Sequence, residues 1–274
     1  KSERVGMISL TEINKMADQC KVPAETIEKD YAISWILCCL SKSKLRHDFI
    51  FYGGTAIKRI YFEDHRFSED IDLISAHQFT LAYLLQALSS LQYARDDANF
   101  NLSVNQNNII TTKDRVQLFI RYAGYDEIIG APKEVRLDFA MNMPRYGTTV
   151  NRKIIKSYSD LVAQNKTLVV MDLNTILANK LGMLMDVTRN EPRDLFDSWF
   201  LLKRMDPLEL DSEKIRQAFK EKYGFRPTSN VLLSYVKNPR LKAHWTTRLS
   251  KQIALLPDIN LVVKEVGVNL KKLF

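Results

Sequence analysis

The sequence predicts an α+β fold, in which a mixed sheet with flanking helices is followed by a helical C-terminal half. Its 274 residues, 46% hydrophobic and 10% aromatic, suffice for the core of one large domain or of two closely packed ones. Short apolar or alternating runs typical of strands occur in the first half, and from Leu173 onward the apolar spacing is almost wholly helical. No Pro-, Gly- or Ser-rich linker separates the halves. We expect a first domain over 1–165 and a second over 166–274, which completes the active-site cleft.

The first half is predicted to alternate helices and strands. Ser9 and Glu12 have capping-box spacing at the start of a short helix, and Pro23 is expected as the first helical residue of a second one. The apolar run Asp48–Tyr52 predicts a strand that ends at a glycine pair, with a helix after it over Ala56–Phe62. About four strands are expected in all, and the further elements are a strand over Asp70–Ile74, a helix over Phe79–Leu91, and strands over Val116–Tyr122 and Glu134–Phe139. In the second half, we expect helices over Leu173–Val187, Pro192–Arg204, Ser212–Lys222 and Thr246–Leu256.

Composition limits the class of protein. Forty Lys and Arg against 32 Asp and Glu leave a net charge of +8, which favours a polyanionic partner such as a nucleotide or nucleic acid. Cys20, Cys38 and Cys39 lack the spacing of a zinc or disulfide framework, so we expect reduced thiols and a cytoplasmic location. No apolar run has the length of a membrane span, and the first residues do not resemble a signal peptide. A membrane partner is therefore not expected.

A glycine turn is the first part of the expected site. Gly53, Gly54 and Thr55 lie between a predicted strand and a predicted helix. Glycines let a backbone approach a phosphate closely, a threonine adds a hydroxyl, and the N–H groups at the start of a helix attract anions. We therefore expect the triphosphate of a nucleotide to bind here. A glycine pair after a strand is, however, more often an ordinary tight turn.

Two carboxylates follow at strand spacing. Asp70 and Asp72 lie on one face of their predicted strand, with Ile71 and Leu73 on the other. Carboxylate oxygens suit Mg²⁺, which bridges phosphates, so phosphoryl or nucleotidyl transfer is the matching chemistry. The alternative is a solvated strand face. Arg66 and Ser68 lie between the glycine turn and these carboxylates. A glycine turn, a helix, a cation and two carboxylates thus occur within twenty residues, and this combination favours the functional interpretation.

Further candidates come from later elements. Asp138 shares one strand face with Glu134 and Arg136, and it is either a third acidic site residue or a solvated carboxylate beside an arginine. Lys180 interrupts the apolar stripe of its helix, so it either meets a functional anion or extends its ammonium group to water. The first turns of the next helix carry Arg193, Asp194 and Asp197. Acidic residues there are also favourable through the helix dipole alone.

These motifs resemble the AbiE-type abortive-infection toxins (AbiEii/AbiGii, MenT-like), the toxin branch of type IV toxin–antitoxin systems. That group belongs to the DNA polymerase β-like nucleotidyltransferase superfamily. The signature Gly-Gly-Thr-Ala with Arg-x-Ser-x-Asp-Ile-Asp-Leu is the most specific part. The resemblance also covers Glu28–Tyr31, Leu177–Leu181 and Arg193–Asp197. The interval of fourteen residues between Thr55 and Asp70 is longer than is usual in the superfamily.

The resemblance implies a polymerase-β-like sheet and a metal-dependent toxin that transfers NMP from an NTP to an acceptor hydroxyl, with release of pyrophosphate. It implies Mg²⁺ at Asp70 and Asp72, with Asp138 helping one metal and taking the proton of the hydroxyl. It also implies that Lys180 binds the triphosphate, assisted by Lys58 and Arg66. The net positive charge makes the tRNA 3′ end the preferred acceptor, and the resemblance implies a cognate antitoxin and a role in phage defence. The alternatives are protein-directed nucleotidylation and a non-catalytic nucleotide- or RNA-binding module.

Overall fold

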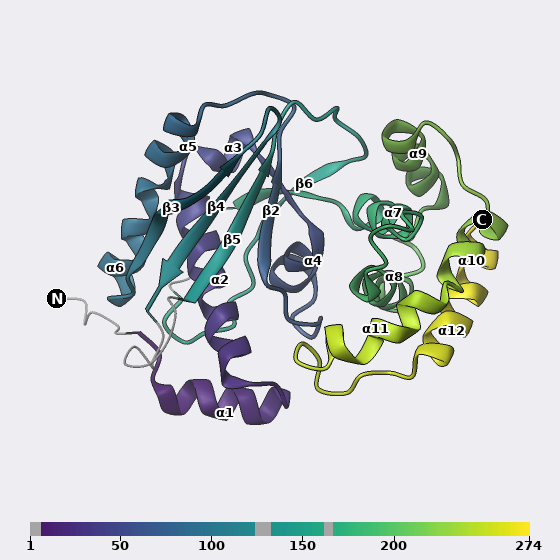
Figure 1. Cartoon of the computed structure of the whole chain (residues 1–274), viewed down its shortest axis with the longest axis horizontal. Coiled ribbons are helices and arrows are strands. Elements are labelled where there is room, and N and C mark those ends of the chain that lie inside the picture. Colours follow the sequence, from purple (N-terminus) through teal and green to yellow (C-terminus); the bar gives the residue numbers. More distant parts are fainter. Residues whose placement is uncertain (1–6, 124–132, 162–166) are drawn as a thin grey trace. The chain divides into compact units, whose positions relative to one another are not determined.

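The chain forms two compact units in a computed structural model that describes residues 7–123, 133–161 and 167–274. The first, here called the sheet unit, consists of Lys1–Met143 and Val150–Val170. The second, the helical unit, consists of Pro144–Thr149 and Met171–Phe274. Figure 1 traces both units along the chain. Within the described ranges, no helix is both long and apolar enough to span a membrane.

A mixed sheet dominates the sheet unit. Over the described residues it has seven strands in the order β3-β4-β5-β2-β1-β7-β6. β2 is parallel to β5 and antiparallel to β1, β1 is parallel to β7, and β4 is antiparallel to both β3 and β5. The strands are β1 (Ile50–Tyr52), β2 (Asp70–Ile74), β3 (Leu102–Thr111), β4 (Arg115–Tyr122), β5 (Lys133–Ala140), β6 (Thr149–Lys153) and β7 (Thr167–Met171). This mixed sheet confirms the α+β fold class.

Helices cover one face of this sheet. The long helix α2 (Ala24–Lys42) is buried along most of its length and packs on β5, and Figure 1 shows it behind the strands. Val135, Leu137 and Phe139 of β5 are fully buried, so the predicted apolar face of this strand belongs to the core. The other helices of the unit are α1 (Leu10–Cys20), α3 (Leu45–Asp48), α4 (Gly53–Ala56), the π-helix η1 (Ile57–Tyr61), α5 (Leu81–Ala87), the 3₁₀-helix η2 (Leu88–Leu91) and α6 (Gln92–Ala98).

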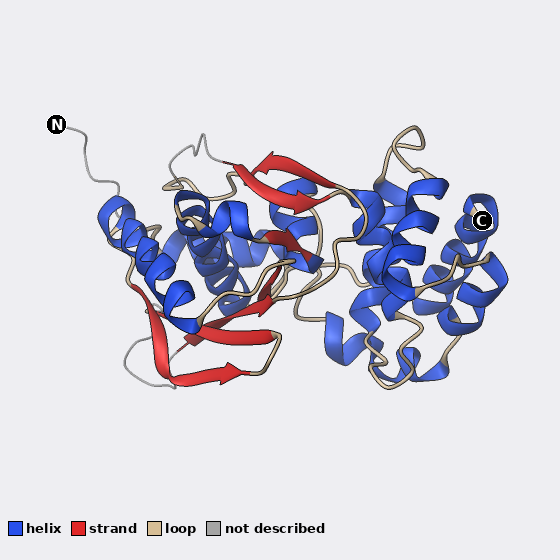
Figure 2. Cartoon of the chain, turned by 90° about the horizontal axis from the view of Figure 1, so that it is seen from above, coloured by secondary structure: helices blue, strands red, loops and turns tan. Residues whose placement is uncertain are grey.

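The helical unit is built from helices that pack on one another, and most residues of its first helix, α7, are buried. In Figure 2, the C-terminal part of the chain is drawn as helices joined by loops. α7 packs against α8 and α9, and α8 packs in turn against α11 and α12. The helices are α7 (Leu173–Met183), α8 (Pro192–Arg204), α9 (Ser212–Tyr223), α10 (Ser229–Val236), α11 (Pro239–Leu249) and α12 (Ile259–Leu273).

Several elements differ from the sequence prediction. Seven strands are present in the described ranges where about four were expected, because β3, β6 and β7 were not recognised. The predicted helix Thr246–Leu256 was wrong: α11 ends at Leu249 and the chain turns before α12. Asn238 and Asp258 cap these two helices with their side chains.

Candidate active site

The glycine turn lies where β1 ends and α4 begins, and five predicted site residues come together at it. Gly53 has a positive φ of +85°, and a Cβ atom there would lie 2.6 Å from Asp72 Oδ2. A Cβ atom at Gly54 would lie 2.7 Å from Arg66 Nη2 and 3.4 Å from Ser68 Oγ. Glycine is thus required at both positions, because the carboxylate and the guanidinium occupy the space of a side chain. The turn, Arg66, Ser68 and Asp72 form one compact group.

Thr55 has a structural contact within this group. Its side chain is buried, and its hydroxyl donates a hydrogen bond to the backbone carbonyl of Asp70. This bond joins the helix after the turn to the first residue of β2. The expected contact between the Thr55 hydroxyl and a phosphate therefore stays a prediction that would require this bond to break.

Lys58 stabilises the loop that carries Arg66 and Ser68. Its ammonium donates to the carbonyls of Glu63 and His65, both at 2.9 Å, and lies 3.9 Å from the centroid of the Phe67 ring. Burial lowers the pKa of Lys58 to about 8. The structure thus places the Lys58 ammonium against the backbone of this loop, and its predicted contact with the nucleotide stays a prediction.

The predicted aspartates share one face of the sheet. Asp70 and Asp72 are half-buried on β2, and Asp138 of β5 is in register with Asp72. Arg136 Nη2 lies 2.6 Å from Asp70 Oδ2. The polar face expected from the alternation of Glu134, Arg136 and Asp138 is therefore continuous with that of β2.

Asp138 is more enclosed than the other two. Its Oδ1 accepts from Arg115 Nε at 2.6 Å and its Oδ2 accepts from Gln117 Nε2 at 2.9 Å. Only 5% of its side chain is exposed. Asp138 thus lies beside an arginine, as one of the two interpretations expected. This arginine is Arg115 of β4 and not Arg136.

The fit of the aspartates to Mg²⁺ depends on these contacts. Among the described residues, no three His, Cys, Asp or Glu side chains are grouped so that they could hold one ion. Asp70 and Asp72 still fit a hard cation, because they are half-exposed oxygen ligands beside the glycine turn. The arginine that pairs with Asp70 is 39% exposed and can be displaced. Asp138 as a third ligand stays a prediction.

Lys180 lies in the helical unit within a cluster of ion pairs. Its ammonium is 3.0 Å from Asp194 Oδ1 and 2.7 Å from Asp197 Oδ2. Arg189 Nε lies 2.9 Å from Asp194 Oδ2. Asp194 and Asp197 are buried, so a buried charge on α8 is paired with a cation on α7. The lysine in the apolar stripe therefore has carboxylate partners and does not simply extend to water.

These contacts change the interpretation of the first turns of α8. Asp194 and Asp197 contact cations of their own unit, and a buried carboxylate would repel a triphosphate. Arg193 lies 3.1 Å from Glu191, the residue that caps α8. Direct nucleotide contacts of Arg193, Asp194 and Asp197 stay predictions, and the structure gives both aspartates the position of counter-ions that orient Lys180.

Lys222 of α9 was not recognised from the sequence. Its ammonium donates to Asn179 Oδ1 at 2.6 Å, one residue before Lys180. Burial first, and the charge of Lys180 second, lower its pKa to about 8. It is the last residue of a predicted helix with ordinary basic residues around it, so no local pattern distinguished it.

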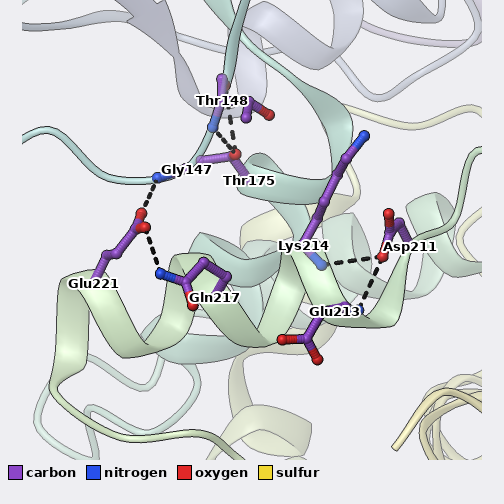
Figure 3. A pocket seen from close by; sticks show the side chains of 8 residues that line it. All are labelled: Gly147, Thr148, Thr175, Asp211, Glu213, Lys214, Gln217 and Glu221. Carbon is purple, nitrogen blue, oxygen red and sulfur yellow. Dashed lines mark hydrogen bonds between the residues drawn. The ribbon is translucent and has the colours of Figure 1, made fainter.

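A separate cavity of about 280 Å³ lies between α9 and the start of α7. Figure 3 shows Glu221 accepting hydrogen bonds from the Gly147 N–H and from Gln217, while Lys214 extends from the same helix. Its lining is mixed in charge, and its carboxylates accept hydrogen bonds from the protein or lie in ion pairs. The residues are Gly147, Thr148, Thr175, Asp211, Glu213, Lys214, Gln217 and Glu221. None of the predicted site residues lines it.

Comparison with known proteins places the chain in a family. No curated protein sequence matches it. Among solved structures, MenT4, the nucleotidyltransferase toxin Rv2826c from Mycobacterium tuberculosis H37Rv, is similar with a TM-score of 0.64 and 16% identity over 97% of this chain and 89% of that one. JHP933 from Helicobacter pylori is similar with a TM-score of 0.60 and 18% identity over 92% and 93% of the two chains. Both likenesses show a common fold.

A family model described as nucleotidyl transferase AbiEii toxin of a type IV toxin–antitoxin system matches residues 35–265. The match includes the glycine turn, the aspartates of β2 and the Lys180 cluster, and it spans most of the chain. This protein therefore belongs to the AbiEii family of nucleotidyltransferase toxins.

Proposed function

We propose that this toxin transfers a nucleoside monophosphate from an NTP to the 3′-terminal hydroxyl of a tRNA. The family supports a nucleotidyltransferase with a nucleotide substrate and an antitoxin partner. The observation that carries the assignment to particular residues is the close approach of Asp72 to Gly53 and of Arg66 to Gly54. A glycine backbone, a cation and a carboxylate are the groups that a metal–triphosphate complex requires.

In the proposed reaction, the acceptor oxygen forms a bond to the α-phosphorus, and the bond from that phosphorus to the oxygen bridging it to the β-phosphorus breaks. Pyrophosphate leaves with the electron pair of this bond. The proton of the hydroxyl passes to a carboxylate of the polar sheet face, for which Asp138, in register with Asp72, is our candidate. Mg²⁺ bound by Asp70 and Asp72 would neutralise charge on the phosphates.

The remaining residues bind and orient. Arg66 and the Gly53–Gly54 backbone bind phosphate oxygens, and the Ser68 hydroxyl donates a hydrogen bond to the phosphate beside them. Lys58 holds the loop of Arg66 through two backbone carbonyls. Lys180 of the helical unit stabilises negative charge on the departing pyrophosphate, with Asp194 and Asp197 fixing its position.

The acceptor is tRNA in this proposal because the net charge of +8 favours a polyanion. A role in abortive infection and phage defence, in the cytoplasm, follows from the same proposal.

The test incubates the purified chain with each of the four α-³²P-labelled NTPs, Mg²⁺, and either total tRNA or cell protein. We expect label on RNA with one or more NTPs and loss of that label with EDTA. Label on protein alone would replace tRNA by a protein acceptor, and no label on either would favour a non-catalytic binding module. Asp72→Asn serves as the inactive variant, and Asp96→Asn, at an exposed position of α6, is its matched control.

A further inference from the structure

Lys222 is a largely buried cation whose ammonium contacts an amide oxygen and two aromatic rings. Its ammonium donates to Asn179 Oδ1 at 2.6 Å and lies 5.0 Å and 5.2 Å from the ring centroids of Tyr146 and Tyr223. Of the residues that the structure describes, no carboxylate lies within ion-pair distance of it. An amide oxygen and two aromatic faces leave donors of the ammonium unused.

The charges around Lys222 do not balance. The cluster holds three cations, Lys180, Arg189 and Lys222, and two buried carboxylates, Asp194 and Asp197. Lys180 contacts both carboxylates, and Arg189 contacts Asp194. The excess positive charge is therefore located at Lys222, where burial makes it unfavourable. A bound anion would remove this penalty.

A second unused donor lies next to this cation in the sequence. The Tyr223 hydroxyl is buried and has no hydrogen-bond partner among the described residues. A Cβ atom at Gly182 of α7 would lie 2.4 Å from it, so the hydroxyl is pressed against the helix that carries Lys180. Buried hydroxyls are normally satisfied, and an acceptor oxygen would satisfy this one.

We infer that Lys222 and Tyr223, together with Lys180, form a phosphate-binding site of the helical unit. The inference rests on the proposed function, which makes the occupant the phosphate chain of the nucleotide and, after transfer, pyrophosphate. A phosphate fits because its oxygens are acceptors only, and the Lys222 ammonium and the Tyr223 hydroxyl both have donor capacity left over. The site assigns a binding role to Lys222 and Tyr223, which the family signature at Lys180 and Arg193–Asp197 does not include.

The experiment measures binding of inorganic pyrophosphate to the full chain by calorimetry, without divalent metal. Lys222→Met is compared with Lys220→Met, which removes an exposed lysine from the same helix. We expect affinity to fall about ten- to hundredfold for Lys222→Met, as for the loss of a charge-assisted hydrogen bond, and to stay within twofold for Lys220→Met. An unchanged affinity in Lys222→Met overturns the inference.

Tyr223→Phe keeps the ring and removes only the hydroxyl, so it tests the site even if Lys222→Met fails to fold. We expect its affinity for pyrophosphate to fall about threefold or more while its melting temperature stays equal or rises. A lower melting temperature with unchanged affinity would mean that the hydroxyl has only a structural role, against the inference.

The same samples separate this inference from the proposed function. Asp72→Asn is expected to lose transfer and to keep metal-free pyrophosphate binding. If Lys222→Met lowers pyrophosphate binding but the wild type shows no transfer activity, the site is supported and the proposed function is rejected. If the wild type catalyses transfer but Lys222→Met binds pyrophosphate as tightly as the wild type, the function is supported and the site is rejected.

Discussion

The carboxylates of the two units differ in burial and in their partners. In the sheet unit, Asp70 is half-buried and pairs with Arg136, whose side chain is 39% exposed. In the helical unit, Asp197 is fully buried and pairs with Lys180, whose side chain is only 12% exposed. An exposed partner is easily displaced and a buried one is not. The comparison indicates that the sheet unit offers its carboxylates to a ligand, whereas the helical unit uses them to hold a cation.

The largest effect is expected at the sheet-unit aspartates. Asp70→Asn or Asp72→Asn should lower the transfer rate by about 10³ or more, because each removes a metal-binding oxygen, without lowering the melting temperature. Like-charge repulsion in the absence of metal is relieved by either change. Label transfer to RNA and thermal unfolding measure the two effects. Turnover within tenfold of wild type would show that these carboxylates are not metal ligands.

Lys180→Met should affect both transfer and stability. We expect transfer to fall by about 10², as for the loss of one electrostatic stabiliser. The free energy of unfolding should fall by about 3–5 kcal/mol, because the buried Asp197 and Asp194 both lose Lys180, although Asp194 keeps its contact with Arg189. Adding Asp197→Asn should recover part of the stability and none of the rate. Recovery of the rate by this second change would assign Lys180 a purely structural role.

Lys222 should make the free energy of unfolding depend on pH. Its pKa is about 8 in the folded state, from burial first and Lys180 second, against 10.5 in an ordinary lysine. Between these values the unfolded chain binds more protons, so the free energy of unfolding rises with pH. Lys180, Arg189 and Asp194 contribute to the charge around it, and burial raises the pKa values of Tyr146 and Tyr223.

The measurement compares wild type with Lys222→Met by chemical denaturation from pH 7 to 10.5. The variant should be the more stable at pH 7, and this advantage should shrink by about 2 kcal/mol at the upper end. If Lys222→Met is less stable than wild type at pH 7, the charge of Lys222 is not uncompensated in the folded state.

The smallest effect is expected at Arg136. Arg136→Gln removes the competitor for Asp70 and should tighten Mg²⁺ binding by a few fold, the scale of an exposed ion pair. The Mg²⁺ concentration that gives half-maximal transfer reports it. A higher Mg²⁺ requirement would indicate that Arg136 supports the site rather than competing with the metal.

Local patterns predicted the fold class and the sheet-unit site for a physical reason. Gly53 to Asp72 span twenty residues, and alternation along β2 places Asp70 and Asp72 on one face in any sheet. β3 was missed because its sequence, Leu102–Thr111, includes a run of Asn and Gln, and its pairing with β4 contains an irregularity between Val104 and Ile109. Pairing within the sheet stabilises this strand against its weak local propensity.

The sequence by itself determined the glycine turn, the alternating aspartates, the positive charge and the membership of a nucleotidyltransferase toxin family, because these depend on residue type and short spacing. Only the tertiary structure decided which groups are paired. Arg115 reaches Asp138 from a neighbouring strand, and Lys222 meets Asn179 from another helix, 43 residues away. Charge pairing and burial depend on which elements pack together, and no local pattern contains that information.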